Sequence, residues 1–309
     1  MRVVFAGSGD FAVPSLRALD QAGHSVVLVL TAPDRLGSRG RPARRPVRDL
    51  ALELGAPLAK PDRLAVDSLG GINLDSAELL IVCDYGQLLP TSVLQLFQRG
   101  AVGVHPSLLP KLRGASPISG AILEGLRETG VTIYQMDSRM DAGPILAQRV
   151  QPVSSNVTAP SLSDQLAQLA AGLLIETMAN LAELQEQATA QDEADATFTT
   201  KVAKEDGEIS WELGAETIDR KVRALQPWPG TVASIAGARV KLLAGHPGEL
   251  SQGLTAQPPG TILAVSAGSA LVATGDGAYE LDLLQPPGGT PMAPAAYLRG
   301  RRLVPAGQC

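Results

Sequence analysis

Short apolar runs alternate with amphipathic segments along the first half of the chain. The run at residues 3–6 ends in Gly-Ser-Gly, a helical pattern marked by Phe11, Leu16 and Leu19 follows, and residues 26–30 are apolar again. This order predicts a strand, a helix and a second, parallel strand. Further apolar runs occupy residues 79–82, 101–104 and 131–134. We therefore expect a Rossmann-like, doubly wound α/β domain with a mostly parallel sheet.

The pattern changes after residue 160. Leucines at helical spacing over residues 161–184 predict a helix that closes the first domain, and residues 185–200 have the polar composition of a solvated connector. A helical pattern over residues 215–225 then gives way to short strand patterns at residues 240–243, 260–265 and 270–274. Glycine and proline separate these strands, which is typical of a small β-barrel. We accordingly expect a first domain over residues 1–190, a linker over 191–204 and a C-terminal β-barrel over 205–309.

Composition places the chain among ordinary globular proteins. Its 309 residues are 45% hydrophobic and 18% charged, which excludes a disordered or fibrous chain. Cys83 and Cys309 are the two cysteines, and no Cys/His cluster has zinc spacing, so we expect neither a disulfide scaffold nor a metal. No apolar run reaches the roughly 18 residues that a bilayer crossing requires. We expect a cytoplasmic protein without a membrane partner.

Charge is segregated along the chain. The net charge is −5, yet residues 1–50 hold eight Lys/Arg against four Asp/Glu, and residues 51–200 hold eight against seventeen. Six arginines lie within fourteen positions that are also rich in glycine and proline: Arg35, Arg39, Arg41, Arg44, Arg45 and Arg48. An acidic protein with one basic loop favours binding of a polyanion at that loop.

The turn after the first strand offers one candidate site. Gly7-Ser8-Gly9-Asp10-Phe11-Ala12 fits the pattern G-x-G-x-x-[G/A], and Asp34 follows beyond the second strand. Such a turn is typical of dinucleotide binding and supports the alternative of an NAD-dependent oxidoreductase. Against it, any strand-to-helix turn favours glycine, and Pro33-Asp34-Arg35 reads as the start of a loop.

A second candidate site combines a histidine and a carboxylate. His105 follows the strand at residues 101–104, at the carboxyl edge of a parallel sheet where α/β proteins bind ligands. The segment 137–143, which contains Asp137 and Asp141, follows the strand at residues 131–134, and we expect it at the same edge, where it would supply a carboxylate that orients or charges His105. Each residue alone reads equally well as a turn residue. Together they indicate acid–base chemistry.

At these residues the sequence resembles the methionyl-tRNA formyltransferases and the wider group of enzymes that use 10-formyltetrahydrofolate. The resemblance covers essentially the whole chain in ordered blocks. These are Phe5-Ala6-Gly7 with Asp10-Phe11-Ala12, Pro33-Asp34-Arg35, Tyr85-Gly86-Gln87-Leu88-Leu89-Pro90, His105-Pro106-Ser107-Leu108-Leu109-Pro110, Arg113-Gly114-Ala115, Gly130-Val131-Thr132, Met136-Asp137, Asp141-Ala142-Gly143 and Pro227-Trp228-Pro229-Gly230.

The resemblance implies transfer of a formyl group from 10-formyltetrahydrofolate to methionyl initiator tRNA, without a metal, and we expect a monomer. His105 and Asp141 fall on the family's catalytic histidine and aspartate. The folate pocket would be lined by Gly86, Gln87, Leu88, Ser107, Leu108, Leu109, Pro110, Met136 and Asp137. The C-terminal barrel and the basic loop would bind the tRNA, the loop through Arg39, Arg41, Arg44, Arg45 and Arg48.

Two positions depart from the family pattern. Gly103 stands where the family has an asparagine, whose amide would polarise the formyl carbonyl, and loss of one such donor lowers rates by about 10²–10³. A bound water or the backbone amides of residues 105–107 could replace this donor. Asp84 stands where the family usually has alanine. Two further alternatives therefore stay open: a formyltransferase acting on an amino sugar nucleotide, and a catalytically impaired homologue that binds folate or tRNA.

Overall fold

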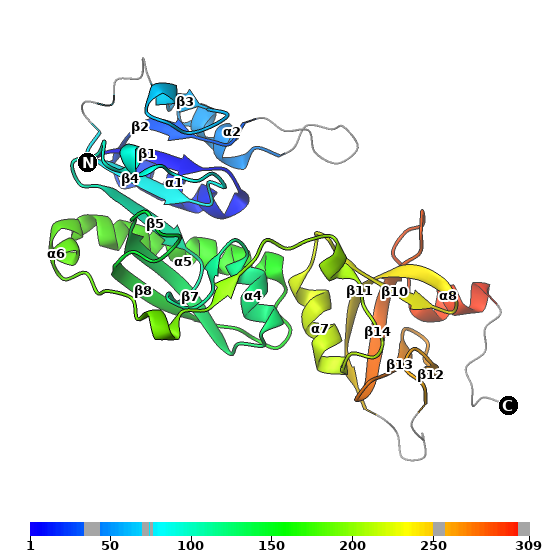
Figure 1. The fold of residues 1–309 in the computed structure, drawn as a ribbon. Coiled ribbons are helices and arrows are strands. Elements are labelled where there is room, and N and C mark those ends of the chain that lie inside the picture. The colour runs from blue at the N-terminus through cyan, green and yellow to red at the C-terminus, as the bar shows by residue number, and fades with distance from the viewer. Residues whose placement is uncertain (34–43, 70–73, 75–76, 250–256, 302–309) are drawn as a thin grey trace. The chain divides into compact units, whose positions relative to one another are not determined.

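The computed structural model describes residues 1–33, 44–69, 74, 77–249 and 257–301. Contacts divide the chain into two compact units (Figure 1). Unit 1 consists of Met1–Pro117, Arg127–Val153 and Ser161–Thr200, and unit 2 consists of Ile118–Leu126, Ser154–Pro160 and the chain from Lys201 onward. Each unit has its own hydrophobic core.

A seven-stranded sheet forms the centre of unit 1, in the order β3-β2-β1-β4-β5-β7-β8. The strands are β1 Arg2–Gly7, β2 Ser25–Leu30, β3 Leu58–Ala59, β4 Leu79–Cys83, β5 Ala101–His105, β7 Glu128–Gln135 and β8 Ile145–Pro152. The first five pair in parallel, whereas β7 is antiparallel to both β5 and β8. β4 and β5 are buried over their whole length, which explains their uninterrupted apolar sequences. The expected Rossmann-like α/β fold is confirmed.

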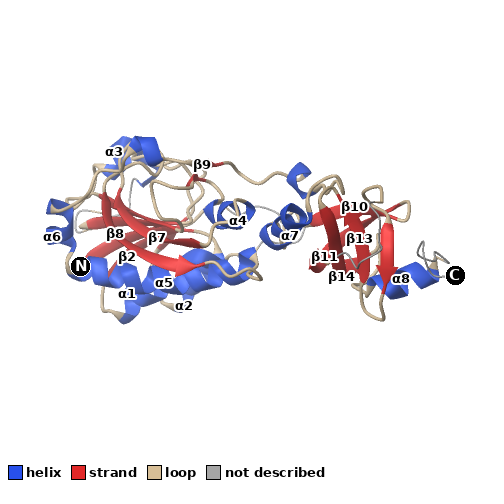
Figure 2. Ribbon diagram, turned by 90° about the horizontal axis from the view of Figure 1, so that it is seen from below, coloured by secondary structure: helices blue, strands red, loops and turns tan. Residues whose placement is uncertain are grey.

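Helices cover this sheet. Figure 2 shows α1 Val13–Gln21, α2 Pro46–Glu53 and α5 Ala159–Ala179 along one face, with α3 Thr91–Leu94 on the other side. The leucines expected to form one helix over residues 161–184 form two, because Asn180 leaves the helical conformation between α5 and α6 Leu181–Glu186. Leu162 and Leu166 of α5 are fully buried. Within the described residues, no helix is long and apolar enough to cross a membrane.

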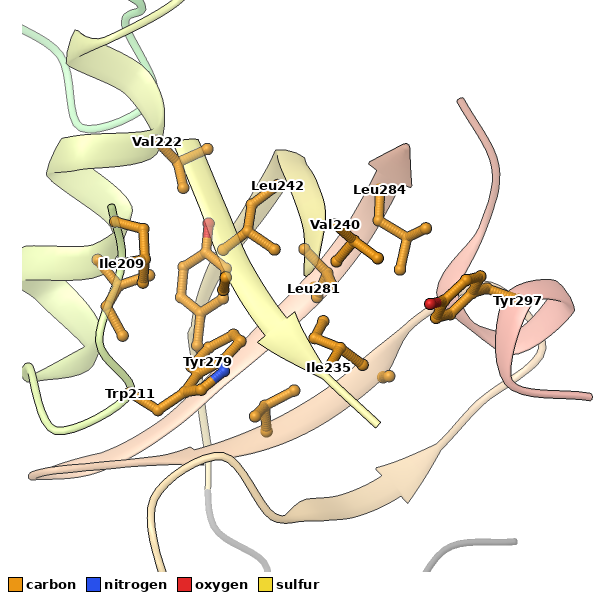
Figure 3. Close-up of a cluster of buried hydrophobic side chains, with 14 of the residues drawn as sticks. Ile209, Trp211, Val222, Ile235, Val240, Leu242, Tyr279, Leu281, Leu284 and Tyr297 are labelled. Atoms are coloured by element: carbon orange, nitrogen blue, oxygen red, sulfur yellow. The ribbon is translucent and has the colours of Figure 1, made fainter. Parts of the chain in front are cut away.

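Unit 2 is built on a five-stranded antiparallel sheet in the order β10-β11-β14-β13-β12. Its elements are α4 Pro117–Leu123, which begins at the boundary with unit 1, α7 Ala215–Ala224, β10 Thr231–Ile235, β11 Ala238–Gly248, β12 Ile262–Val265, β13 Ala270–Thr274, β14 Gly277–Gln285 and α8 Pro294–Gly300. The predicted helix over residues 215–225 and the three predicted strands are thus confirmed. In Figure 3, Trp211 and Tyr279 lie side by side in its core, with Leu242, Leu281 and Leu284 beyond them.

The segment that joins the units is fastened to unit 1 up to Thr200. β9 Phe198–Thr199 pairs with β6 Arg113–Gly114. The buried Arg113 guanidinium donates hydrogen bonds to Gln191 and Glu193, and the Gln191 amide donates to the backbone carbonyls of Asp141 and Gly143 at 2.9 and 2.7 Å. Residues 191–200, which fall within the expected linker, therefore help to hold the loop that carries Asp141.

Candidate active site

His105 ends β5 and is 6% exposed. Its Nε2 lies 2.9 Å from the Leu112 carbonyl oxygen, and its Nδ1 lies 3.7 Å from the Asp141 Oδ2. A carbonyl can only accept a hydrogen bond, so Nε2 carries a hydrogen and the neutral ring has its lone pair on Nδ1. The nitrogen that can take up a proton therefore faces Asp141.

The path of the chain that brings Asp141 to His105 differs from the one expected from the sequence. Because β7 is antiparallel to β5, its carboxyl end lies opposite Val102 rather than beside His105, and the expectation of a shared sheet edge was wrong. The loop at residues 136–144 instead brings Asp141 back to β5. Gly143 permits this course, since a side chain there would collide with the Gln135 carbonyl.

The Asp141 carboxylate is held by two hydrogen bonds. The Gly114 N–H donates to Oδ2 at 2.8 Å and the Tyr134 hydroxyl donates to Oδ1 at 2.7 Å. The Asp141 backbone has a φ of +51°, in the left-handed region that non-glycine residues rarely adopt. Such strain is typical of functional sites and is offset by these contacts.

Gly103 lies directly opposite Tyr134 in the β5–β7 ladder. Side chains two residues apart on a strand share a face, so Gly103, His105, Thr132 and Tyr134 all belong to one face of the sheet. The Tyr134 ring occupies the space into which a side chain at position 103 would extend. Tyr134 belongs to the site, but an apolar run such as residues 131–134 gives no sign of it.

The loop after β5 is anchored to β7 and β8. The Thr132 hydroxyl donates to the Ser107 carbonyl at 2.7 Å and accepts from the Leu109 N–H at 3.0 Å. The Gln148 amide donates to the Leu109 carbonyl at 2.8 Å, and the Ser107 hydroxyl donates to the Lys111 carbonyl at 2.6 Å. The segment 107–110 is therefore rigidly placed beside His105, with Leu108 and Pro110 only partly buried.

In the other two expected folate-binding segments, some side chains bond within the fold and others are exposed. Gln87 uses its amide within the fold, donating to the Pro61 carbonyl and accepting from the Leu64 N–H, while Gly86 has a φ of +75°. Leu88 follows with 83% of its surface exposed. On the second segment Met140 is 63% exposed, whereas the partly buried Met136 packs against the core and Asp137 pairs with Arg139 at 3.2 Å.

The glycine-rich turn after β1 is closed by protein groups. The Ser8 N–H donates to the Asp84 carbonyl at 2.9 Å, and its hydroxyl accepts from the Ala32 N–H at 2.9 Å. The Asp84 carboxylate lies against Gly9, leaving no room for a side chain there. A dinucleotide pyrophosphate at this turn would meet the carboxylates of Asp84 and Asp10, so the oxidoreductase alternative is disfavoured.

Asp84 gives a pH-dependent contribution to stability. Desolvation by the surrounding protein, followed by the charge of Asp10, raises the pKa of the Asp84 carboxyl from 3.8 to about 6, while a hydrogen bond from the Gly9 N–H opposes the shift. A group whose pKa is higher in the folded chain makes stability fall as pH rises between these two values. We expect Asp84→Asn to raise the free energy of unfolding at pH 7.5 and to leave it nearly unchanged at pH 3.5.

Urea unfolding at the two pH values measures this difference. Asp20→Asn, at an exposed carboxylate of α1, is the matched control for the removal of a carboxylate. An equal gain for Asp84→Asn at both pH values would contradict the assignment.

The basic loop is described in part. Arg39 and Arg41 lie outside the described residues. Arg44 pairs with Asp10 at 3.1 Å, with both side chains mostly exposed, and Arg45 and Arg48 stand at the start of α2 and within it. Within the described part of the chain, no group of three or more His, Cys, Asp or Glu side chains could hold a metal ion.

Both parts of the chain match known proteins. Residues 1–178 match the formyl transferase model and residues 201–302 match the model of the formyl transferase C-terminal domain. A methionyl-tRNA formyltransferase from Roseiflexus castenholzii is 42% identical over 98% of this chain and 97% of its own length. One from Heliobacterium modesticaldum is 39% identical over 99% of this chain and 98% of its own length.

Solved structures share the fold at lower identity. HypX from Aquifex aeolicus in complex with tetrahydrofolic acid has a TM-score of 0.64 and 21% identity over 96% of this chain and 47% of its own. An N-formyltransferase from Helicobacter canadensis, in complex with folinic acid and dTDP-3-aminofucose, has a TM-score of 0.67 and 15% identity over 91% and 98%. Taken with the full-length matches at about 40% identity, these findings show that the chain belongs to the methionyl-tRNA formyltransferase family.

Proposed function

We propose that this protein transfers the formyl group of 10-formyltetrahydrofolate to the α-amine of methionine on initiator tRNA. The observation that carries the proposal is the buried His105, whose proton-accepting Nδ1 faces a fixed Asp141 carboxylate. Relatives about 40% identical over nearly the whole chain bear the name of this enzyme. The amino sugar alternative is supported by structures of sugar N-formyltransferases that are 15–18% identical.

His105 is proposed as the proton acceptor. The attacking amine must lose a proton as its nitrogen bonds to the formyl carbon, and the nitrogen that leaves the formyl carbon must gain one. The Nδ1 of His105 can receive the first proton and return it to the departing nitrogen, while Nε2 stays bonded to the Leu112 carbonyl. Asp141, held by Gly114 and Tyr134, would stabilise the imidazolium between these steps.

The surroundings of this pair suit a flat, partly apolar co-substrate. Leu88 follows β4, whose carboxyl end lies beside that of β5, and Met140 immediately precedes Asp141. Both side chains are largely exposed, as expected of walls that a ligand covers. We propose Ser107, Leu108, Leu109 and Pro110 as the rigid side of the pocket and Gly86, Gln87, Met136 and Asp137 as supports for Leu88 and Met140. The folate derivative supplies the activated formyl group.

Transfer can be measured in single-turnover experiments that mix excess protein with 10-formyltetrahydrofolate and methionyl initiator tRNA. We expect formylmethionyl-tRNA to form, and an amino sugar nucleotide offered instead to stay unmodified. If only the amino sugar nucleotide is formylated, the substrate is the amino sugar and not the tRNA. Tight binding of both substrates without transfer would show a protein that only binds them.

The basic loop is our proposed contact with the tRNA backbone, together with unit 2. Loss of a phosphate contact reduces the slope of log affinity against log salt by about 0.7–0.9. We therefore expect Arg41→Ala/Arg44→Ala/Arg45→Ala to weaken tRNA binding and to flatten this slope by about 2–3. Arg149→Ala is the control, because it removes an arginine of β8 that pairs with Glu176 of α5, and it should leave the slope unchanged. An unaltered slope in the triple variant would exclude the loop as a phosphate contact.

The organisation that we propose around this activity is simple. Residues 1–190 would carry the folate site, residues 191–204 the connection and residues 205–309 the tRNA-binding part, in a protein that acts as a cytoplasmic monomer. Analytical ultracentrifugation with and without tRNA checks the monomer, and a one-to-one complex is the expected result.

A further inference from the structure

The hydroxyl of Tyr134 occupies the place of a side chain that β5 lacks. A Cβ atom built on Gly103 would lie 2.7 Å from the Tyr134 hydroxyl oxygen. In an asparagine the amide nitrogen lies two bonds from Cβ, about 2.4 Å away. The tyrosine on β7 thus brings a hydrogen-bonding atom about as close to this point as an asparagine on β5 would.

Other polar groups beside His105 have partners that hold the loop or the site in place. The Thr132 and Ser107 hydroxyls donate to the carbonyls of Ser107 and Lys111, and the Gly114 N–H donates to the Asp141 Oδ2. The Tyr134 hydroxyl donates to the other oxygen of the same carboxylate, Oδ1. Rotation about a single C–O bond redirects its hydrogen, and Asp141 then keeps the hydrogen bond from Gly114.

The Tyr134 hydroxyl also keeps its hydrogen. Burial of the side chain, followed by the negative charge of Asp141, raises the pKa of Tyr134 well above 10. The group is therefore a neutral donor throughout the physiological range. A neutral O–H that can turn toward developing negative charge in a buried site is the kind of group that lowers the barrier of acyl transfer.

We propose that Tyr134 is a catalytic residue whose hydroxyl donates a hydrogen bond to the formyl oxygen, in place of the side chain absent at Gly103. The inference rests on the proposed formyl transfer. As the amine nitrogen bonds to the formyl carbon, the carbonyl π electrons move to the oxygen, and the Tyr134 O–H turns from Asp141 to this oxygen without giving up its proton. His105 takes the amine proton and becomes the new donor to Asp141. When the bond to the departing nitrogen breaks, that nitrogen receives the proton from His105 and the carbonyl reforms.

The central test is Tyr134→Phe in single-turnover formylation. We expect the rate to fall by about 10²–10³ while the affinity for 10-formyltetrahydrofolate changes less than threefold, because the bond forms only as charge develops. Tyr279→Phe is the matched control, since it removes a buried tyrosine hydroxyl from the core of unit 2 and should leave the rate unchanged. A natural protein that transfers no formyl group would defeat the proposed function itself. An active natural protein with a Tyr134→Phe rate within threefold would overturn this inference alone.

A second arm separates donation to substrate from mere support of Asp141. Tyr134→Phe is compared with Asp141→Ala and with the double variant. If Tyr134 contacts the formyl oxygen, its loss lowers the rate further in the Asp141→Ala background. If Tyr134→Phe has no effect in that background, the hydroxyl acts only through Asp141 and the inference is rejected.

Restoration of an amide supplies the third arm. Gly103→Asn/Tyr134→Leu clears the space and places a donor on β5, and we expect at least a tenfold recovery over Tyr134→Leu. Gly103→Ala/Tyr134→Leu has the same space but no donor and should recover nothing. Equal rates for the two double variants would count against a donor at this position.

Discussion

Replacement of His105 by alanine is expected to lower the single-turnover rate of formyl transfer by a factor of about 10²–10⁴, the usual contribution of a positioned acid–base group. The ring is 6% exposed, and its orientation is set by the Leu112 carbonyl, so alanine removes a fixed group whose Nδ1 accepts the amine proton. Affinity for the folate co-substrate should change little, since the proton moves only during the reaction.

His24→Ala is the control for loss of a histidine. His24 lies 3.4 Å from the N-terminal amine, before β2, and its removal should leave the rate within twofold. His105→Gln tests the remaining possibility that a hydrogen-bond donor suffices. A His105→Gln rate near that of the natural protein would remove His105 from the proton path and leave it a structural role.

A methyl group at position 103 is expected to damage both activity and stability. In Gly103→Ala the new Cβ would overlap the Tyr134 ring, which is 3% exposed and cannot swing away without losing its hydrogen bond to Asp141. Overpacking of this kind destabilises by about 1–3 kcal/mol. The rate of transfer should fall at least as far as in Tyr134→Phe, because the hydroxyl leaves its place and Asp141 loses a donor.

Urea unfolding and single-turnover rates together check this expectation. Gly172→Ala, at a position of α5 with open space around it, is the matched control and should gain up to about 1 kcal/mol. In Gly103→Ala/Tyr134→Leu we expect stability to recover while the rate stays low. Full activity of Gly103→Ala would mean that Tyr134 does not occupy this space during the reaction.

The sequence was a good guide to the elements because runs such as residues 79–82 and 101–104 are buried on both faces, which demands uninterrupted apolar residues. Burial on both faces gives no sign of the direction in which a strand runs. Residues 131–134 read alike in a parallel or antiparallel strand, so the reversal of β7 was not predictable from their hydrophobicity. The break at Asn180 was likewise missed, because asparagine also occurs within helices.

For the candidate site, sequence reasoning found His105 and Asp141 but not the residues that set their geometry. Leu112 orients His105 through a backbone carbonyl, which any amino acid could supply. Gln191 and Arg113 lie 78 positions apart in the sequence and meet only through the path of the chain after α6. From the sequence, position 103 only lacks a hydrogen-bond donor. Tyr134 fills the space beside Gly103 because of the register of β5 and β7, which the sequence does not show.

The pairing of β6 with β9 connects the end of unit 1 to the candidate site. Thr199 of β9 lies opposite Gly114, and the Gly114 N–H holds the Asp141 carboxylate. One residue further along, Thr200 is the last residue of unit 1 and Lys201 begins unit 2. One backbone pairing and one hydrogen bond therefore connect the last residues of unit 1 to the carboxylate that faces His105.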